Sequence, residues 1–317
     1  MADVAAALAN WNGLQHIGRC LESLHKQTDP PNEIVVVDNG STDGSKEWIR
    51  QHYPAVRLLE NSHNTGYAAG YNQAIRATST PFVLILNTDA FLAVDFIEHA
   101  TRAISAHSDA AAVTGRTFQE ATNELISGGF FLRRQVRIVP GELSDETVEV
   151  FGVTGSVALF RRAALEALAV ENQYFDEAYF CYGEDIDLAW RAQLQGWKML
   201  SLPVAAAHHV GSGSLDGRLR FVEKPQLYQR HTLKNRYLTV IKNASPGILL
   251  ELLPGLVLTE LLLWPFLLLR QPWRVPYLLL SFADVLRLFP STLRKRRQVQ
   301  ARRRVSAAQI RRYFKGF

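Results

Sequence analysis

The sequence predicts an α/β fold with a parallel, doubly wound sheet, followed by a C-terminal extension of apolar and then basic helices. Three observations predict this fold. Apolar runs alternate with segments of helical spacing over the first ninety residues, as in a parallel sheet with helices on both faces. The run Phe82–Leu86 has no polar alternation, which is typical of a strand that is covered on both faces. After Gly247 the composition becomes Leu-rich and then strongly basic.

The first elements follow from apolar spacing and turn residues. Val4–Asn10 is expected to be the first strand, although its run of alanines is a weak strand former. The turn Asn10–Gly13 precedes Leu14–Lys26, whose apolar residues recur at helical spacing. The strand Ile34–Val37 ends in a loop that can cap the next helix. The following elements are a helix at Lys46–His52, a strand at Val56–Leu59, a helix from Asn64 to Ala77 and the strand Phe82–Leu86.

The middle of the chain has a less regular pattern. Glu184–Leu194 has the composition of a helix, and Lys198–Leu202 that of a strand, followed by three alanines and His208-His209. The other expected elements are strands at Ile126–Phe131, Val148–Phe151 and Val157–Phe160, and a helix that begins at Arg161.

Charge and composition divide the chain near residue 243. The formal net charge is +5, but Ser291–Phe317 holds ten of the 35 basic residues and no acidic one, which leaves 25 basic against 30 acidic residues elsewhere. Ile248–Leu269 is almost entirely apolar, with two glutamates and two prolines. We expect a catalytic domain at 1–243 and a helical membrane-associating region at 244–317. The alternative is that the Leu-rich helices pack on the catalytic domain or form a dimer interface.

Other chemistry is limited. The two cysteines do not form a disulfide framework or a Cys-x-x-Cys pattern, and the first residues lack the basic region of a signal peptide. Neither a Walker motif nor a Gly-x-Gly-x-x-Gly motif follows a predicted strand. The basic tail has Leu-rich neighbours without interleaved aromatic residues, which favours an anionic membrane surface over nucleic acid.

Three acidic clusters follow apolar runs and are the main candidates for a site. Asp38 ends a strand and can bind a nucleobase or ribose, or serve as a loop anchor. Asp89, with Asn87, can provide oxygen ligands to Mg²⁺, or form an Asx turn. Glu184–Asp187 packs three carboxylates at a helix start, where crowding favours a general base, although Asp187 and Arg191 can simply pair. His209 is a candidate metal or phosphate contact.

The ordered motifs resemble a known family. The segments that match are Asn10–Gly13, Ile34–Ser45, Asn64–Asn72, Leu86–Asp89, Phe175–Phe180, Glu184–Arg191, Gly196–Lys198, His209–Ser212 and Lys234–Tyr237. Together they resemble the family 2 inverting glycosyltransferases, most closely the rhamnosyltransferase-like branch. The resemblance implies a GT-A fold, which is a Rossmann-like α/β domain.

The resemblance also implies a site. Asp185 would be the general base, and Asp89 with His209 would hold Mg²⁺ or Mn²⁺ and the donor diphosphate. The implied nucleotide-sugar contacts are Asn10, Asn12, Asp38, Asn64, Gly66, Asn72 and Asn87, and the implied acceptor side is Glu184, Asp187, Trp190 and Arg191. Two departures from the family are Asn87, where many relatives have Asp, and the alanine-rich first strand.

These motifs predict a metal-dependent inverting glycosyltransferase on the cytoplasmic face of the membrane. The resemblance implies a nucleotide-diphospho-sugar as the donor, and dTDP-rhamnose is the donor that it favours. The implied acceptor is a glycan or polyprenyl-linked saccharide of the cell envelope. The alternatives are another donor, such as UDP-galactofuranose or UDP-N-acetylglucosamine, and a non-catalytic sugar-nucleotide-binding protein. The charged residues of the acidic clusters argue against the last alternative.

Overall fold

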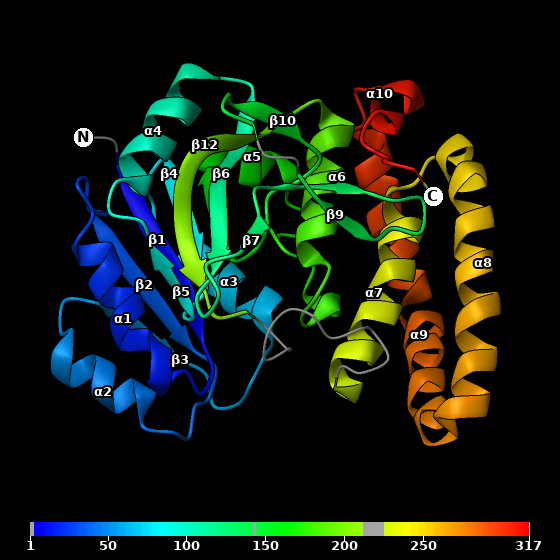
Figure 1. Cartoon of the computed structure of the whole chain (residues 1–317), viewed down its shortest axis with the longest axis horizontal. Helices are drawn as coiled ribbons and strands as arrows, with labels where there is room; N and C mark the ends of the chain where they lie inside the picture. Colours follow the sequence, from blue (N-terminus) through cyan, green and yellow to red (C-terminus); the bar gives the residue numbers. More distant parts are fainter. Residues whose placement is uncertain (1–2, 142–143, 212–224, 317) are drawn as a thin grey trace.

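A mixed β-sheet with helices on both faces fills the larger part of the molecule, and three long helices stand beside it (Figure 1). A computed structural model describes residues 3–141, 144–211 and 225–316. The elements up to the middle of the chain are β1 (Val4–Asn10), α1 (Leu14–His25), β2 (Glu33–Asp38), α2 (Ser45–His52), β3 (Arg57–Glu60), α3 (Tyr67–Arg76), β4 (Phe82–Leu86), β5 (Ala90–Leu92), α4 (Phe96–Ala106), β6 (Ala110–Gln119), β7 (Leu125–Ser127), β8 (Phe130–Leu132) and β9 (Ile138–Pro140). The later elements are β10 (Val148–Val150), β11 (Val157–Arg161), α5 (Arg162–Leu168), the 3₁₀ helix η1 (Glu177–Tyr179), α6 (Glu184–Gln195), β12 (Lys198–His209), α7 (Gln226–Asn243), α8 (Pro246–Arg270), the 3₁₀ helix η3 (Pro272–Arg274), α9 (Val275–Ala301) and α10 (Ala307–Arg311).

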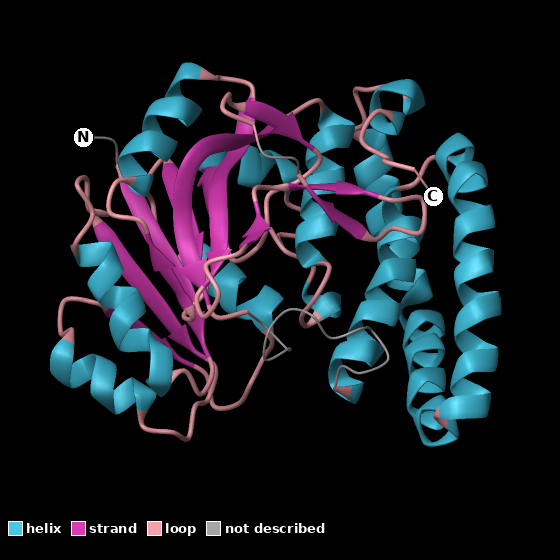
Figure 2. Ribbon diagram, viewed as in Figure 1, coloured by secondary structure: helices cyan, strands magenta, loops and turns pink. Residues whose placement is uncertain are grey.

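The sheet has the strand order β10-β12-β6-β11-β4-β1-β2-β3. Strands β4, β1, β2 and β3 are parallel, and β11 is antiparallel to both of its neighbours. Two hydrophobic cores lie on the two faces of this sheet, visible as helical layers in Figure 2. Helices α1, α2 and α4 cover one core, and α3, α5 and α6 cover the other. The carboxyl ends of β1, β2 and β4 therefore lie side by side at one edge, where ligands bind in open α/β sheets.

The alanine-rich first strand is central, between β2 and β4, and it is almost fully buried. Its small side chains allow α3 to approach the sheet closely. A methyl group on Gly70 of α3 would lie 3.0 Å from the Cβ of Ala9 and 2.9 Å from the amide of Asn39. Close packing of α3 thus accounts for residues that are weak strand formers in this strand.

The expected α/β fold is confirmed, with three differences along the chain. The strand expected at Lys198–Leu202 continues to His209, because the alanines after it pair with β6 and β5. The strand expected at Ile126–Phe131 is divided into β7 and β8 at Gly128-Gly129, and Gly129 adopts a φ of +81°. The elements β5, α4, β6, β9 and α7 were not predicted from sequence. Part of the Gly/Ser loop after His209, from residue 212, lies outside the described residues.

The C-terminal helices share a core with the sheet domain. Ile248, Leu252 and Leu256 of α8, Val299 of α9 and Tyr313 are buried in the same cluster as α6. Tyr313 and Phe314 pack against Phe151 and Trp190. The division at residue 243 stays a prediction, and the expected alternative of packing on the catalytic domain is realised for one face of these helices.

The basic tail is bound to the protein at many of its residues, and the prediction that it lies on an anionic membrane surface stays a prediction. Lys295 pairs with Asp176 inside the protein, and Arg311 and Arg312 pair with Glu251 and Glu149. Other basic side chains donate hydrogen bonds to backbone carbonyl oxygens: Arg296 to Ile241 and Ala244, Arg302 to Ala169, and Arg303 to Val305. These contacts use part of the hydrogen-bonding capacity of the tail, and the paired side chains of Arg311 and Arg312 stay 51% and 58% exposed.

Candidate active site

The ends of β1 and β2 form the floor of the site. Asn10 and Asp38 are paired in register, and the amide of Asn10 donates to Asp38 Oδ2 at 2.9 Å and to Ser45 at 2.9 Å. The other oxygen of Asp38 accepts from the backbone N–H of Ser41 at 2.8 Å. Both side chains have no exposed surface. In this conformation they hold the loop at 39–45, and a direct contact of Asp38 with a nucleotide stays a prediction that requires this loop to move.

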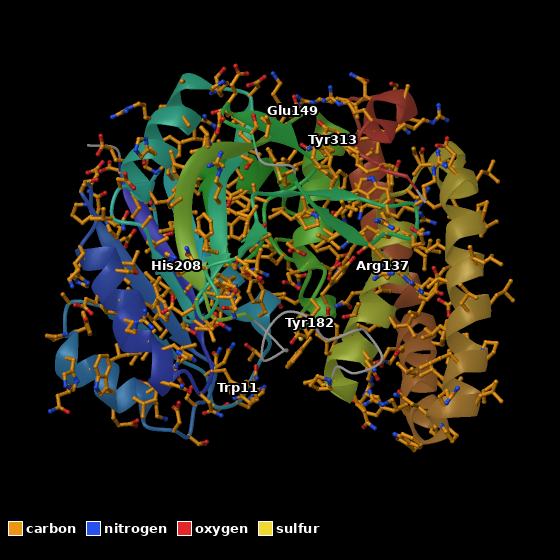
Figure 3. The ribbon with its side chains drawn as sticks, in the orientation of Figure 1. Trp11, Arg137, Glu149, Tyr182, His208 and Tyr313 are labelled. Atoms are coloured by element: carbon orange, nitrogen blue, oxygen red, sulfur yellow. The ribbon has the colours of Figure 1, made fainter. Side chains whose placement is uncertain are left out.

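One buried acceptor beside this floor has no partner among the described residues. Asn10 Oδ1 is buried and unpaired, and a methyl group on Gly13 would lie 2.2 Å from it and 3.3 Å from the hydroxyl of Thr88. An unpaired buried acceptor is costly, so a ligand N–H or O–H that reaches it would be stabilised. Asn12 is exposed at the same turn, with a φ of +50°, and its side chain accepts from Thr42. Trp11 is exposed beside it (Figure 3).

The segment Asn64–Asn72 connects this floor to the third acidic cluster. Asn64 accepts from the backbone N–H of Gly66 at 2.8 Å. Gly66 has a φ of +88°, and a Cβ there would lie 2.6 Å from the ring and the carbonyl oxygen of Phe180. Asn72 is fully buried, and both ends of its amide bind the backbone of Phe175. The prediction that Asn72 contacts the nucleotide is therefore corrected, because it joins α3 to the segment before η1.

Asp89 and His209 lie together at the end of β5 and β12, 120 residues apart in sequence. His209 Nε2 is 3.0 Å from Asp89 Oδ1 and 3.4 Å from the amide of Asn87. The pairing of β5 with β12 places His209 opposite Ala90 and so fixes this contact. Burial acts to raise the pKa of Asp89, but the hydrogen bond and charge of His209 outweigh it, and the net pKa lies below its usual value. The carboxylate is therefore ionised at neutral pH.

These residues suit a divalent cation whose remaining ligands come from a phosphate. Asp89 offers an ionised oxygen that is partly exposed, and His209 a ring nitrogen. Among the described residues, no group of three or more His, Cys, Asp and Glu side chains could hold a metal ion alone. Mg²⁺ commonly takes one or two carboxylates plus substrate phosphates, so the donor set fits a site that is completed by a diphosphate. His208 does not belong to it, because strand alternation directs it to Asn123 and Phe118.

Asp185 lies in the first turn of α6, after Gly183 with a φ of +87°. Burial raises the pKa of Asp185, although backbone hydrogen bonds from Ile186 and Gly155 oppose the shift. A methyl group on Gly155 would lie 3.8 Å from the Asp185 Cβ and 2.6 Å from the Tyr67 hydroxyl. The loop that contains Gly155 ends at Ser156, whose carbonyl oxygen accepts from the backbone N–H of Asn87. One short loop thus connects Asp185 to the Asn87–Asp89 segment.

Comparisons with known proteins agree with this geometry. The family model for Glycosyl transferase family 2 matches residues 7–169. The chain belongs to this family. It is 30% identical over 244 residues to the N-acetylglucosaminyl-diphospho-decaprenol L-rhamnosyltransferase of Mycobacterium tuberculosis (strain ATCC 25618 / H37Rv), covering 66% of this chain and 76% of the relative. It is 23% identical to the low-salt glycan biosynthesis hexosyltransferase Agl10 of Haloferax volcanii, covering 74% of this chain and 75% of that one.

Solved structures support the GT-A fold of this glycosyltransferase. Staphylococcus aureus TarS 1-349 in complex with UDP-GlcNAc superposes with a TM-score of 0.62 at 17% identity, covering 98% of this chain and 89% of that one. GalNAc-T7 with UDP, GalNAc and Mn²⁺ superposes with a TM-score of 0.61 at 18% identity, covering 76% of this chain and 48% of that one. The expected family, fold and enzyme class are therefore confirmed, and the roles of individual site residues stay predictions.

Part of the predicted acceptor side of the glycosyltransferase is wrong. Asp187, Trp190 and Arg191 are in the interior, with at most 2% of their surface exposed. Asp187 pairs with Arg191 at 3.0 Å and with Lys242 at 3.0 Å, and Trp190 packs on Phe151. Burial acts to raise the pKa of Asp187, but Lys242 and then Arg191 outweigh it and lower the net pKa. These residues stabilise the helix that carries Asp185 and are not available to an acceptor.

Glu184 differs from the other acceptor-side residues. It is buried, and its Oε2 atom has no partner among the described residues. Burial first, and then the neighbouring Asp185, raise the pKa of Glu184 well above its usual value. Burial also raises the pKa of Asp185, so the two neighbouring carboxyl groups titrate as a coupled pair beside the site.

The backbone before Glu184 is held by side chains to which the sequence motifs gave no role. Phe180 and Tyr182 both adopt positive φ, at 63° and 68°, which is costly for side chains of this size. Asn235 of α7 holds this backbone, because its amide donates to the carbonyl oxygens of Cys181 at 2.8 Å and Tyr182 at 2.5 Å. Lys234 donates to Ala178 O at 2.7 Å. The only sequence signal was the matching motif Lys234–Tyr237, which carried no role.

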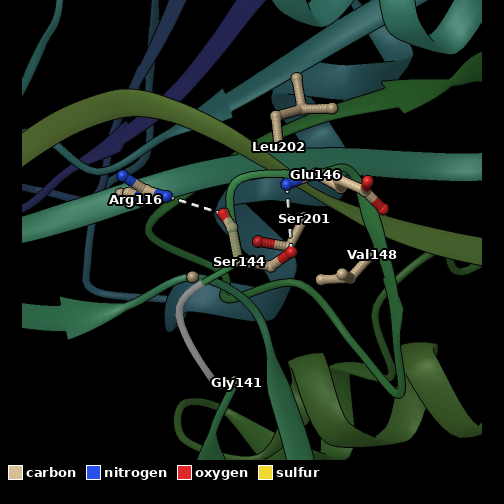
Figure 4. A pocket seen from close by; sticks show the side chains of 8 residues that line it. Arg116, Gly141, Ser144, Glu146, Val148, Ser201 and Leu202 are labelled. Atoms are coloured by element: carbon tan, nitrogen blue, oxygen red, sulfur yellow. Dashed lines mark hydrogen bonds between the residues drawn. The ribbon is translucent and has the colours of Figure 1, made fainter.

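A small concave feature lies away from this site and does not compete with it. Figure 4 shows it between β12 and the loop near Ser144, where Arg116 donates to Ser144 O at 2.7 Å. Its volume is about 10 Å³, which is the space of about one water molecule. A nucleotide sugar cannot enter it.

Proposed function

We propose that this glycosyltransferase transfers a sugar, rhamnose from dTDP-rhamnose, to a polyprenyl-linked saccharide in cell-envelope polysaccharide synthesis. The observation that supports the donor and the acceptor is the 30% identity over 244 residues to the N-acetylglucosaminyl-diphospho-decaprenol L-rhamnosyltransferase. The paired Asp89 and His209, with Asp185 joined to them by one loop, support transfer chemistry over simple binding.

In the proposed reaction, the donor diphosphate lies at Asp89 and His209, and Mg²⁺ or Mn²⁺ held there would neutralise charge on the leaving diphosphate. Asp185 takes the proton of the acceptor hydroxyl as its oxygen attacks the anomeric carbon. The bond from that carbon to the diphosphate oxygen breaks on the opposite face, so the configuration inverts. The products are the extended saccharide, the free nucleoside diphosphate and protonated Asp185.

The environment of Asp185 suits this role. A base acts best when its pKa is close to the working pH, and burial shifts the pKa of Asp185 upward in that direction. Burial and the neighbouring Asp185 also raise the pKa of Glu184, which favours its neutral form beside the proposed base. Tyr67, whose hydroxyl donates to Gly155 O at 2.5 Å, keeps the loop at Asp185 in place.

The test is a panel of nucleotide sugars with Mn²⁺ present, which includes dTDP-rhamnose, UDP-galactofuranose and UDP-N-acetylglucosamine. Thermal stabilisation reports donor binding, and release of the nucleoside diphosphate in the presence of a prenyl-diphosphate-N-acetylglucosamine acceptor reports transfer. We expect dTDP-rhamnose to give the largest response. Turnover with one of the UDP-sugars alone contradicts the donor assignment, and binding without turnover of any donor contradicts the catalytic assignment.

We also propose that the enzyme works at the cytoplasmic face of the membrane as a peripheral protein, where soluble donors meet lipid-linked acceptors. One helix among the described residues, Pro246–Arg270, is long and apolar enough to cross a membrane, with a mean hydropathy of 2.0. Fractionation of cells that express the full chain tests this location. Recovery of the protein only in the soluble fraction contradicts it.

A further inference from the structure

Helix α8 exposes an apolar surface along its whole length. The exposed side chains, called here the outer face of α8, are Leu249, Leu250, Leu253, Val257, Leu258, Leu261, Leu262, Phe266, Leu268 and Leu269, with Trp273 of η3. The buried stripe is narrow and consists of Ile248, Leu252, Gly255, Leu256 and Leu267. Only 22% of the most apolar window of this helix is buried. A surface patch of this size marks an interaction with a partner or a membrane.

The acidic residues of α8 point away from this face. Glu251 is paired with Arg311 at 2.6 Å, and Glu260 contacts Arg236 and Tyr237 of α7 and the indole N–H of Trp264. The other charged residue of α8 is Arg270 at its last position. Every residue of this helix is described, and between Pro246 and Leu269 none of its charged side chains lies on the outer face. In the sequence, the two glutamates suggest that contact of this helix with lipid is costly. In the structure, both are paired with residues of the protein, away from the outer face.

The shape of the outer face favours lipid over a second copy of the chain. Neighbouring positions in the helix are exposed together, as with Leu261 and Leu262, and with Leu268 and Leu269. Because consecutive residues differ by about 100° around a helix, the apolar arc is wider than one side of the helix. A protein partner covers one side of a helix, whereas lipid covers every side that the protein leaves open.

Position and end residues agree with a membrane surface. In Figure 1 the carboxyl ends of β1 and β2 point toward the lower edge of the view, where α8 ends and α9 begins. Trp273, which is 65% exposed, and Arg270 lie at that end, and Trp and Arg are residues of the membrane interface.

We propose that the outer face of α8 is embedded in the boundary between lipid head groups and acyl chains, and that apolar burial carries the attachment without a requirement for anionic lipid. This rests on the proposed membrane location and specifies its mode. The basic tail, which would supply an electrostatic attachment, is largely engaged with the protein through residues such as Lys295, Arg296 and Arg312. Attachment of this kind resists salt, because screening weakens only charge interactions.

The experiment is flotation of the full-length protein with vesicles of neutral phosphatidylcholine, in low salt and in about 1 M NaCl, where the Debye length is about 3 Å. We expect flotation in both, and no more than a twofold gain when phosphatidylglycerol is added. Leu262→Glu/Leu269→Glu should lower the vesicle partition coefficient at least tenfold, since these side chains are 65% and 82% exposed. Val94→Glu, at an exposed position of the sheet domain, is the matched control and should float normally.

Flotation only with anionic vesicles, or its loss in high salt, overturns the apolar mode. Sedimentation of the wild type as a dimer, with the double variant a monomer, overturns it in favour of a second copy. Nucleoside diphosphate release with a short-chain soluble acceptor is measured in parallel. If that activity survives while flotation fails, this inference and the membrane location on which it rests are wrong and the proposed reaction stands; if flotation succeeds without activity, the proposed reaction is wrong.

Discussion

Lys295 of α9 reaches into the interior and contacts the segment that leads to the proposed base. Its Nζ is 2.5 Å from Asp176 Oδ1, and Lys242 is 2.5 Å from Asp176 Oδ2. The first oxygen also accepts from the backbone N–H of Ala178, which caps η1. Lys295→Met keeps much of the side-chain volume but removes one of the two cations that neutralise Asp176.

The structure sets the size of the expected loss. Removal of one partner of a buried ion pair costs about 3–5 kcal/mol, and the remaining Lys242 places this variant at the lower end, about 3 kcal/mol. For a chain of 317 residues, with an unfolding entropy of about 2.1 cal/mol/K per residue, that corresponds to a Tm lower by roughly 4–5 °C. We expect kcat to fall about tenfold, or about 1.4 kcal/mol, because the strained backbone from Phe180 to Tyr182 loses an anchor. Donor binding at Asp89 should be unchanged.

The assay combines thermal unfolding, kcat and the donor Kd for Lys295→Met, Asp176→Asn and the double variant. The double variant should lose less stability than the sum of the single variants, by about 1 kcal/mol or more, since it leaves no unpaired carboxylate. Arg297→Met, at an exposed position two residues along the same helix, is the control. Additive losses, or a Tm equal to that of the control, would refute the buried-pair argument, and a raised donor Kd would refute the assignment to the catalytic segment.

The other predictions concern the site and its pH dependence. Asp185→Asn should lower kcat by about 10²–10⁴-fold with normal donor binding, and near-normal turnover would show that another group is the base. Asp89→Ala should weaken donor binding by calorimetry in Mn²⁺ but hardly in EDTA, and equal losses in both would exclude a metal role. Because burial raises the pKa of Asp185, kcat should fall on acidification at a pH above 3.8, the ordinary carboxyl value; an acid limb at or below 3.8 contradicts this. The pKa values of Asp176 and Asp187 are lowered in the folded protein, so their ionised forms stabilise the fold at every pH above the ordinary carboxyl value. This stabilisation is lost only as the pH falls below that value. Acid unfolding followed by circular dichroism should therefore show no contribution from these two residues above about pH 4.

The sequence could predict the parts of the fold that local patterns specify. The end of β2 at Asp38, the end of β4 at Leu86, the helix after Gly183 and the Leu-rich helix near residue 248 follow from apolar spacing and turn residues, and the structure confirms them. The continuation of β12 to His209 did not follow, because alanine is depleted in strands and only pairing with β6 and β5 holds those residues there.

The errors at the candidate site have a different cause. Asp187 and Arg191 have the spacing of a surface pair on a helix, and the sequence does not show that Lys242 and Tyr179 enclose them. Asn235 could be assigned no role, because its partners are carbonyl oxygens of a loop more than fifty residues away. Burial and long-range backbone contacts depend on the tertiary fold, so a motif identifies which residues matter before it shows which of them can reach a ligand.

The C-terminal helices are better understood as part of the catalytic apparatus than as a tether. A tether would need only an apolar surface and a flexible connection, but α7 supplies Asn235 and Lys242, and α9 supplies Lys295, to the segment between Asp176 and Asp187. These contacts fix both the charge and the backbone on each side of Asp185. The glutamates of α8 pair with α7 and the tail, so the helix with the apolar outer face is joined to the same elements. The helix of the proposed membrane contact and the backbone around the proposed base are therefore held by one shared set of contacts.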